Sequence, residues 1–241
     1  MDNISNRLEG FTILFGVAEI FGALAVILVT VWLGYYHNGF AWRSAPAVEF
    51  NWHPVLMTIG MVFLYGNSIM VYRAFPNHSK RSLKLTHAII HAVAFLLAII
   101  ALQAVFDSHN LAPTKIPNLY SLHSWIGLSA IILFACQLLA GLVTFLYPGL
   151  KQTFRAAYMP VHVYFGILGF VCAVASSIMG ILEKSIFRKE YSSFDSETWL
   201  ANFLGVVLLI FGSLVVYLVS ESRYKRQPRP EDEILLTGNL E

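Results

Sequence analysis

Residues 118–125, NLYSLHSW, lead directly into residues 126–146, IGLSAIILFACQLLAGLVTFL. The second stretch has almost no polar side chains, and a helix needs about 20 such residues to cross a bilayer. His123 therefore stands at the entrance of an expected membrane span. Because an unsatisfied imidazole is costly in hydrocarbon, this histidine is expected to have a partner inside the membrane.

The rest of the chain has the same character. Of its 241 residues, 57% are hydrophobic and 12% are charged, which is about half the charged fraction of a soluble domain. Six apolar runs predict an all-α polytopic membrane protein, and they cover residues 11–33, 53–72, 87–106, 123–147, 160–182 and 199–220. We expect one membrane domain over residues 11–220, with an N-terminal segment over 1–10 and a tail over 221–241.

Positive charges are unevenly divided between the two ends of these spans. Eleven of the sixteen Lys and Arg residues fall in the N-terminal segment, the loops 73–86 and 148–159, and the tail. Lys and Arg concentrate in the cytoplasmic loops of membrane proteins, so both termini and these two loops are predicted to be cytoplasmic. The net charge is only +2 and no basic patch is interleaved with aromatic residues, so no nucleic-acid partner is expected.

Four histidines begin four successive spans. His53 and His123 lie at the non-cytoplasmic ends of the second and fourth spans, and His87 and His162 lie at the cytoplasmic ends of the third and fifth. A single buried histidine is more often a hydrogen-bonded polar residue than a ligand. Four that pair by depth indicate instead two cofactor sites in a four-helix bundle. Two imidazoles on facing helices suit axial ligation of a haem iron.

Other metal sites fit the pattern less well. The mixed Cys, His and carboxylate clusters of zinc sites are absent, and HAIIH at residues 87–91 is not an HExxH motif. No CxxCH motif is present, so the two haems are expected to be of b type, held without covalent attachment. His91 lies one turn from His87 on the same face of the helix, so either is a candidate ligand, although the depth of His87 matches His162 better.

Four segments resemble the cytochrome b561 family: EFNWHPVLM (49–57), LTHAIIHA (85–92), NLYSLHSWIG (118–127) and MPVHVYFG (159–166). The resemblance runs from about residue 34 to residue 226 and keeps all four histidines in order and context. It implies six helices, a four-helix core that holds two b haems, and usually a homodimer. It also implies the pairs His53–His123 and His87–His162, and electron transfer from cytoplasmic ascorbate to monodehydroascorbate or ferric iron across the membrane.

Basic residues surround the expected cytoplasmic haem. Ascorbate is a monoanion at neutral pH, so its site should offer cations and hydrogen-bond donors. Positive-inside charges alone are the alternative explanation. The family resemblance implies that Lys80, Lys84 and Arg155 bind cytoplasmic ascorbate, and Arg73, which ends the second span, is added to this group.

At the opposite end, FDSHN (106–110) and Tyr120 flank the His53–His123 pair. Asp107 and His109 are candidate contacts for a second small substrate or a metal ion, with Phe106 and Tyr120 as its walls. An ordinary loop histidine is the alternative for His109. The resemblance favours an acceptor site here, where chelated ferric iron is reduced or vesicular ascorbate is regenerated from its radical.

Short patterns bear on the membrane in which the protein resides. EDEILL (231–236) resembles a dileucine sorting signal, and GFAW (39–42), MVFLYG (61–66) and LFACQ (133–137) resemble the lysosomal branch of the family. A late endosomal or lysosomal membrane is therefore favoured, with another secretory vesicle or the plasma membrane as alternatives.

Two other functions compete with electron transfer from ascorbate. A histidine-dependent proton or metal transporter would be expected to have broken helices and several charges within the membrane. Glu19 is the only charged residue near the middle of a span, and no motif gives it a role. A quinone-coupled cytochrome b subunit is the third hypothesis, and the basic residues beside the cytoplasmic haem favour a soluble anionic donor over a quinone.

Overall fold

The computed structural model describes residues 2–227, so the pattern EDEILL lies outside the described residues. Within residues 2–227 the regular structure is entirely helical, and six helical spans are long and apolar enough to cross a membrane. The spans are Gly10–Tyr36, Pro46–Ala74, Lys80–Asn110, Leu122–Leu146, Gln152–Ile186 and Ser196–Ser220. The predicted all-α architecture with six spans is confirmed.

The α-helices of the described chain are, in order, α1 (Asp2–Val31), α2 (Pro46–Glu49), α3 (Trp52–Met57), α4 (Tyr65–Ala74), α5 (Lys80–Asn110), α6 (Leu122–Gly141), α7 (Gln152–Ile186) and α8 (Ser196–Ser220). Shorter π-helical segments cover Trp32–Tyr36, Thr58–Leu64 and Leu142–Leu146. Two 3₁₀ turns, Tyr191–Ser193 and Ser222–Tyr224, lie on either side of α8. The second span therefore consists of α3, a π-helical segment and α4 in continuous succession.

Capping residues explain where two of the histidine-bearing helices begin. The Ser79 side chain accepts a hydrogen bond from the backbone N–H of Ser82 at the start of α5, at 3.2 Å. Ser121 and Ser124 form a reciprocal capping box at the start of α6. These bonds satisfy amides that have no partner within the first helical turn. They set the residue at which α6 begins, and with it the depth of His123.

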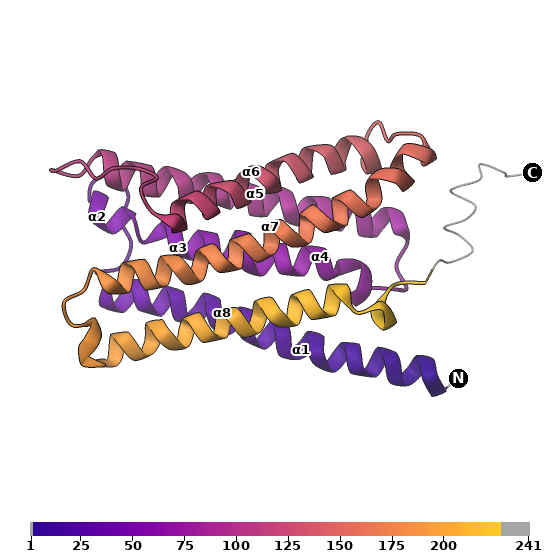
Figure 1. The fold of residues 1–241 in the computed structure, drawn as a ribbon, viewed down its shortest axis with the longest axis horizontal. Coiled ribbons are helices and arrows are strands. Elements are labelled where there is room, and N and C mark those ends of the chain that lie inside the picture. The colour runs from indigo at the N-terminus through magenta and orange to yellow at the C-terminus, as the bar shows by residue number, and fades with distance from the viewer. Residues whose placement is uncertain (1, 228–241) are drawn as a thin grey trace, which may run out of the picture.

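The six spans run along the long axis of the molecule, and the N-terminus lies at the same end as the C-terminal end of α8 (Figure 1). The second span packs along α5, and α6 packs along α7. The first and last spans, α1 and α8, pack along each other and close one side of the bundle. The four histidine-bearing spans therefore form two antiparallel pairs.

The outer surface of the bundle is apolar. Large side chains such as Ile20 (67% exposed), Trp125 (68%) and Leu139 (65%) point away from the core. A soluble protein rarely exposes a continuous apolar surface of this extent. Hydrocarbon satisfies such side chains, so this surface is where lipid contacts the spans.

The π-helical segment Thr58–Leu64 lies midway along the second span and close to α5. A Cβ atom added to Gly60 would be 3.0 Å from the backbone oxygen of Ala94, so a larger residue would push the two helices apart here. On either side of the segment, His53 and Ser68 both make hydrogen bonds to α5. The second span is thus hydrogen-bonded to α5 on both sides of its π-helical segment.

Candidate functional site

The four histidines predicted as haem ligands lie in two pairs at opposite ends of the bundle. The ring centroids of His53 and His123 are 6.2 Å apart, and those of His87 and His162 are also 6.2 Å apart. Two metal–imidazole bonds of about 2 Å each would separate the ring centroids by roughly 6 Å. The structure therefore brings the predicted partners together at a spacing that fits one iron between each pair.

Three of these rings donate a hydrogen bond through Nδ1 to a backbone oxygen of the helix they face. The contacts are His53 to Ala101 at 3.1 Å, His87 to Ser68 at 2.9 Å, and His123 to Ser176 at 2.7 Å. A carbonyl acceptor keeps the proton on Nδ1 and leaves Nε2 free, as in histidines that bind metals. The orientation of these three rings therefore fits axial ligation.

His162 is held differently. Its Nδ1 is buried and has no hydrogen-bond partner among residues 2–227. The ring instead packs between Phe145, with centroids 5.3 Å apart, and Tyr158, with centroids 6.0 Å apart. Aromatic packing thus fixes this ring where a carbonyl fixes the other three.

Two glycines allow the rings on α6 and α7 to lie against the opposite helix. A Cβ atom added to Gly180 of α7 would be 2.7 Å from Cε1 of His123, and one added to Gly141 of α6 would be 3.0 Å from Cε1 of His162. A larger residue at either place would displace the imidazole. Helix α6 therefore supplies His123 and the space for the ring of His162, and α7 supplies His162 and the space for the ring of His123.

A cavity of about 780 Å³ lies beside the His53–His123 pair. Its lining is mainly apolar and comes from the first five spans, and its volume is within the roughly 300–1,000 Å³ of cofactor pockets. Within the described part of the chain, no cluster of three or more His, Cys, Asp or Glu residues could hold a bare ion. Two opposed imidazoles in an apolar cavity suit a metal that brings its own equatorial ligands, as haem does.

His91 lies beside the second pair. Its ring centroid is 4.4 Å from that of His87, and it packs edge-on against Tyr65 at 5.1 Å and Phe134 at 5.0 Å. The side chain is buried among these aromatic rings, and its Nδ1 has no hydrogen-bond partner in the described chain. His87, with a carbonyl partner and a ring opposite His162, has the geometry that axial ligation requires, and its assignment as the ligand stays a prediction.

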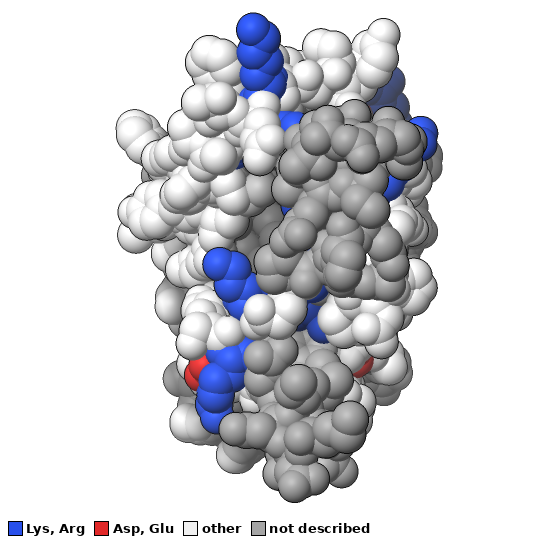
Figure 2. Space-filling view, turned by 90° about the vertical axis from the view of Figure 1, so that its right-hand side faces the viewer, with Lys and Arg blue, Asp and Glu red and all other residues white. Residues whose placement is uncertain are grey.

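Lys and Arg residues gather at the end of the bundle that carries the His87–His162 pair (Figure 2). Lys84 is within electrostatic range of both Lys80 and Arg155. Its ammonium donates a hydrogen bond to the backbone oxygen of Phe145 at 3.1 Å, next to His162. We call Lys80, Lys84 and Arg155 the basic cluster. Nε of Arg155 is buried without a hydrogen-bond partner among the described residues, so a donor is available there.

Arg73 is engaged elsewhere. Its guanidinium donates hydrogen bonds to the backbone oxygens of Val219 and Glu221, where α8 ends. The last carbonyls of a helix have no partner within the helix, and a cation near them is stabilising. The structure thus gives Arg73 a contact that holds α8 against the second span, and the basic cluster is defined without it.

Three of the four predicted acceptor-site residues, Phe106, His109 and Tyr120, line the cavity beside the His53–His123 pair. Nδ1 of His109 lies 3.1 Å from the side-chain oxygen of Asn118. Partial burial and the nearby carboxylate of Glu183 raise the pKa of Tyr120 above its ordinary value. Tyr120 is 55% exposed, so this part of the lining faces the solvent, and we call it the mouth of the cavity.

The fourth residue, Asp107, does not line the cavity. Its carboxylate accepts a hydrogen bond from Nε of Arg43 at 2.8 Å. This ion pair links the end of α5 to the loop before α2. The structure therefore separates Asp107 from the other three residues.

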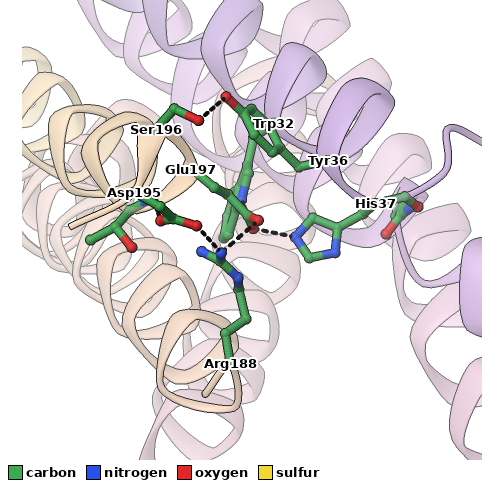
Figure 3. A network of polar contacts seen from close by, with 9 residues as sticks. Trp32, Tyr36, His37, Arg188, Asp195, Ser196 and Glu197 are labelled. Carbon is green, nitrogen blue, oxygen red and sulfur yellow. Dashed lines mark hydrogen bonds and ion pairs between the residues drawn. The ribbon is translucent and has the colours of Figure 1, made fainter. Parts of the chain in front are cut away.

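A buried polar network at the same end was not foreseen from the sequence (Figure 3). One carboxylate oxygen of Glu197 accepts a hydrogen bond from Nε1 of Trp32 at 2.9 Å and lies 2.8 Å from Nε2 of His37. The other oxygen pairs with Arg188 at 3.1 Å, and Arg188 also pairs with Asp195 at 2.5 Å. The network joins the end of the first span, the segment after α7 and the start of α8.

This network reaches the helix that carries His53. The side-chain amide of Asn51 donates to the backbone oxygens of His37 and Gly39, both at 2.7 Å, and Asn51 is two residues before His53. Burial and the positive charge of Lys184 hold the pKa of His37 below its ordinary value. Charges at the ends of apolar spans are usually solvated, so nothing in the residue pattern indicated that this cluster would be buried.

Comparison with known proteins identifies the family. The family model described as "Eukaryotic cytochrome b561" matches residues 52–188. The chain is 41% identical over 220 residues to the transmembrane ascorbate-dependent reductase CYB561 of Sus scrofa, covering 90% of this chain and 86% of that protein. It is 45% identical over 230 residues to the plasma membrane ascorbate-dependent reductase CYBRD1 of Xenopus tropicalis, covering 93% and 80%.

A third relative is the putative transmembrane ascorbate-dependent reductase CYB561 homologue of Caenorhabditis elegans, 40% identical over 233 residues, with 92% and 88% covered. The four histidines all lie within the segment that the family model matches. With its six spans, the chain is a multi-pass membrane protein. It belongs to the cytochrome b561 family of b-type haem proteins.

Proposed function

We propose that this protein is an ascorbate-dependent transmembrane reductase, which passes single electrons from ascorbate to an acceptor on the other side of the membrane. The observation that carries the proposal is the placement of two histidine pairs at opposite ends of one bundle, each with ring centroids 6.2 Å apart. His53 with His123, and His87 with His162, hold one b haem each. The haems supply the one-electron chemistry, and the chain positions the two substrates.

The basic cluster supports ascorbate as the donor. Lys80, Lys84 and Arg155 offer positive charge and hydrogen-bond donors beside the His87–His162 pair, which suits a monoanion. Ascorbate gives up one electron and one proton to become its radical, and the proton passes to water. The excess of Lys and Arg supports a cytoplasmic location for this end.

Chelated ferric iron is the acceptor we favour, which would make the protein a ferrireductase. The imidazole of His109 and the phenol of Tyr120 at the cavity mouth are nitrogen and oxygen donors of kinds that iron accepts. Regeneration of ascorbate from monodehydroascorbate is the alternative. The sorting-signal pattern favours a late endosomal or lysosomal membrane, and a homodimer is expected from the family resemblance.

The arrangement offers less support for a transporter. Between the two histidine pairs the bundle interior is filled by packed aromatic rings, with Tyr65 lying 4.7 Å from Phe134 and 5.6 Å from Phe170 between centroids. A transport path requires polar or charged groups along the membrane. Packed aromatic rings fit an electron path that excludes water and ions.

A visible spectrum of the purified protein, recorded before and after addition of ascorbate, tests the proposed function. We expect a b-type α-band to appear when ascorbate is added. The pyridine haemochrome assay should give about two haems per chain, because each pair of opposed imidazoles can ligate one iron. Absence of haem absorption would refute the proposal. So would a haem that dithionite reduces and ascorbate does not.

Replacing Lys84 by glutamine is expected to slow haem reduction by ascorbate roughly tenfold, because a hydrogen bond to a charged group contributes about 1.5–3 kcal/mol and partial exposure reduces this. Haem content should not change. The rate is measured by stopped-flow absorbance at the α-band, over a range of ascorbate concentrations.

Lys151→Gln is the matched control, since Lys151 is an exposed lysine at the same end that precedes α7 and lies outside the basic cluster. Ascorbate should reduce the haem of the Lys151→Gln protein as fast as it reduces that of the unmodified protein. If the haem content of the Lys84→Gln protein fell by the same factor as its rate of reduction by ascorbate, the basic cluster would have a structural role instead.

A further inference from the structure

Lys184, near the C-terminal end of α7, lines the cavity beside the His53–His123 pair. Its ammonium lies 4.4 Å from the centroid of the Phe50 ring, in a cation–π contact. Among the described residues it is the one Lys or Arg in the cavity lining. A charge set in a largely apolar wall is screened less than one on an open surface, so it acts more strongly on a bound molecule.

The carboxylates close to Lys184 are engaged with other groups. Glu197, whose charge acts on Lys184, is held by the buried network between the first span, α7 and α8. The carboxylate of Glu183, which also lines the cavity, lies near the phenol of Tyr120. Among residues 10–227, whose side chains the structure describes, no ion pair joins Lys184 to a carboxylate. Its positive charge is therefore available to a molecule that enters the cavity mouth.

We propose that Lys184 determines the specificity of the acceptor site, by binding an anionic oxygen of the acceptor. The site then takes one-electron acceptors that carry negative charge, namely a ferric carboxylate chelate or an organic oxygen-centred radical anion. This inference rests on the proposed function. In the first case the electron delivered by the haems converts ferric to ferrous iron; in the second, the radical takes up one electron and a proton from water.

The position of Lys184 also explains how a mainly apolar cavity can select for charge. His109 and Tyr120 line the same cavity, and neither brings the positive charge of a Lys or Arg side chain. Lys184 does, so it supplies the attraction that draws an anion to the mouth and orients it there. A cationic acceptor of similar size would be repelled by the same group.

The test uses the full-length, haem-loaded protein in vesicles that contain ascorbate, with acceptors added outside. Only protein molecules whose basic end faces the vesicle interior then contribute to the measured rate of acceptor reduction. The acceptors are ferric citrate, enzymatically generated monodehydroascorbate and the cation hexaammineruthenium(III). Lys184→Gln is expected to lower the rate with the anionic acceptors about tenfold at low salt, and to leave the rate with the ruthenium complex unchanged or higher. Lys184→Arg should retain most of the anion preference.

Lys189→Gln is the matched control, because Lys189 is exposed, follows α7 at the same end, and does not line the cavity. It should behave as the unmodified protein does. A slower rate with ferric citrate alone identifies the chelate as the substrate, and a slower rate with the radical alone identifies the organic anion. Both results support the role of Lys184.

Equal rates for Lys184→Gln and Lys189→Gln with both anions would overturn the inference. Equal losses for anionic and cationic acceptors would do the same, since they would indicate general damage. Reduction of the haems by ascorbate is recorded for every protein. If the unmodified protein is not reduced, the proposed function fails; if reduction is normal and acceptor preference does not change, only the assignment of Lys184 fails.

Discussion

Replacing His87 by alanine is expected to remove one haem from the protein and to stop electron flow across the membrane. His87 lies opposite His162, with ring centroids 6.2 Å apart, and its Nδ1 is already bonded to the backbone oxygen of Ser68. Alanine would leave the iron with one axial imidazole in a site shaped for two. With a single haem remaining, the other end of the bundle would lie too far from the donor for electron transfer.

Two measurements check this expectation. The pyridine haemochrome assay should fall from about two haems per chain to about one. Vesicles that contain ascorbate should reduce external ferricyanide only at the background rate. His78→Ala is the control, because His78 is an exposed histidine in the loop before α5, and both values should be normal.

The same experiment decides the ligand assignment. His162→Ala should leave the same residual spectrum as His87→Ala, and His53→Ala and His123→Ala should share a different one. His91→Gln should retain both haems. If His87→Ala kept both haems and His91→Gln lost one, the ligand on α5 would be His91.

Replacing Glu197 by alanine is expected to produce the largest loss of stability. Glu197 is 6% exposed and contacts Trp32, His37 and Arg188. Removing one partner of a buried ion pair leaves the other charge uncompensated and costs about 3–5 kcal/mol. In a chain of this size we expect the midpoint of thermal unfolding to fall on the order of 10 °C.

Thermal unfolding of the detergent-solubilised, haem-loaded protein measures this effect. Glu190→Ala is the control, because Glu190 is an exposed carboxylate between α7 and α8. Its midpoint should not move. Glu197→Gln, which keeps an oxygen for Trp32 and loses the charge, should fall between the two. A midpoint for Glu197→Ala equal to that of Glu190→Ala would show that the network contributes little to stability.

The fold and the pairing of the four histidines could be predicted because both depend on where residues fall along the chain. An apolar run fixes the length of a span, and a histidine at its start fixes the depth of the ring. Alternation of the spans then places His53 beside His123 and His87 beside His162. The fold and the family are confirmed, and the assignment of the four ligands stays a prediction.

The residues that the sequence did not reveal depend on the rotation of each helix. A continuous apolar run does not indicate which face meets a neighbour, so Gly180 and Gly141, which receive the histidine rings, carried no signal. The burial of Glu197 and the free charge of Lys184 arise only after α7 and α8 pack. Likewise, the charge pattern placed Arg73 at the correct end of the bundle but did not indicate that it binds the end of α8.

The way the histidines are shared between helices has a consequence for biogenesis. His53 and His87 belong to one antiparallel hairpin and bond to each other's helix, whereas His123 and His162 belong to the next hairpin. Contacts within each hairpin are far denser than contacts between them. Each proposed haem takes one ligand from each of the two hairpins, so a bound haem would link the two hairpins to each other. We therefore expect haem binding to stabilise the docked hairpins, so that the assembled fraction of the protein rises with the supply of haem.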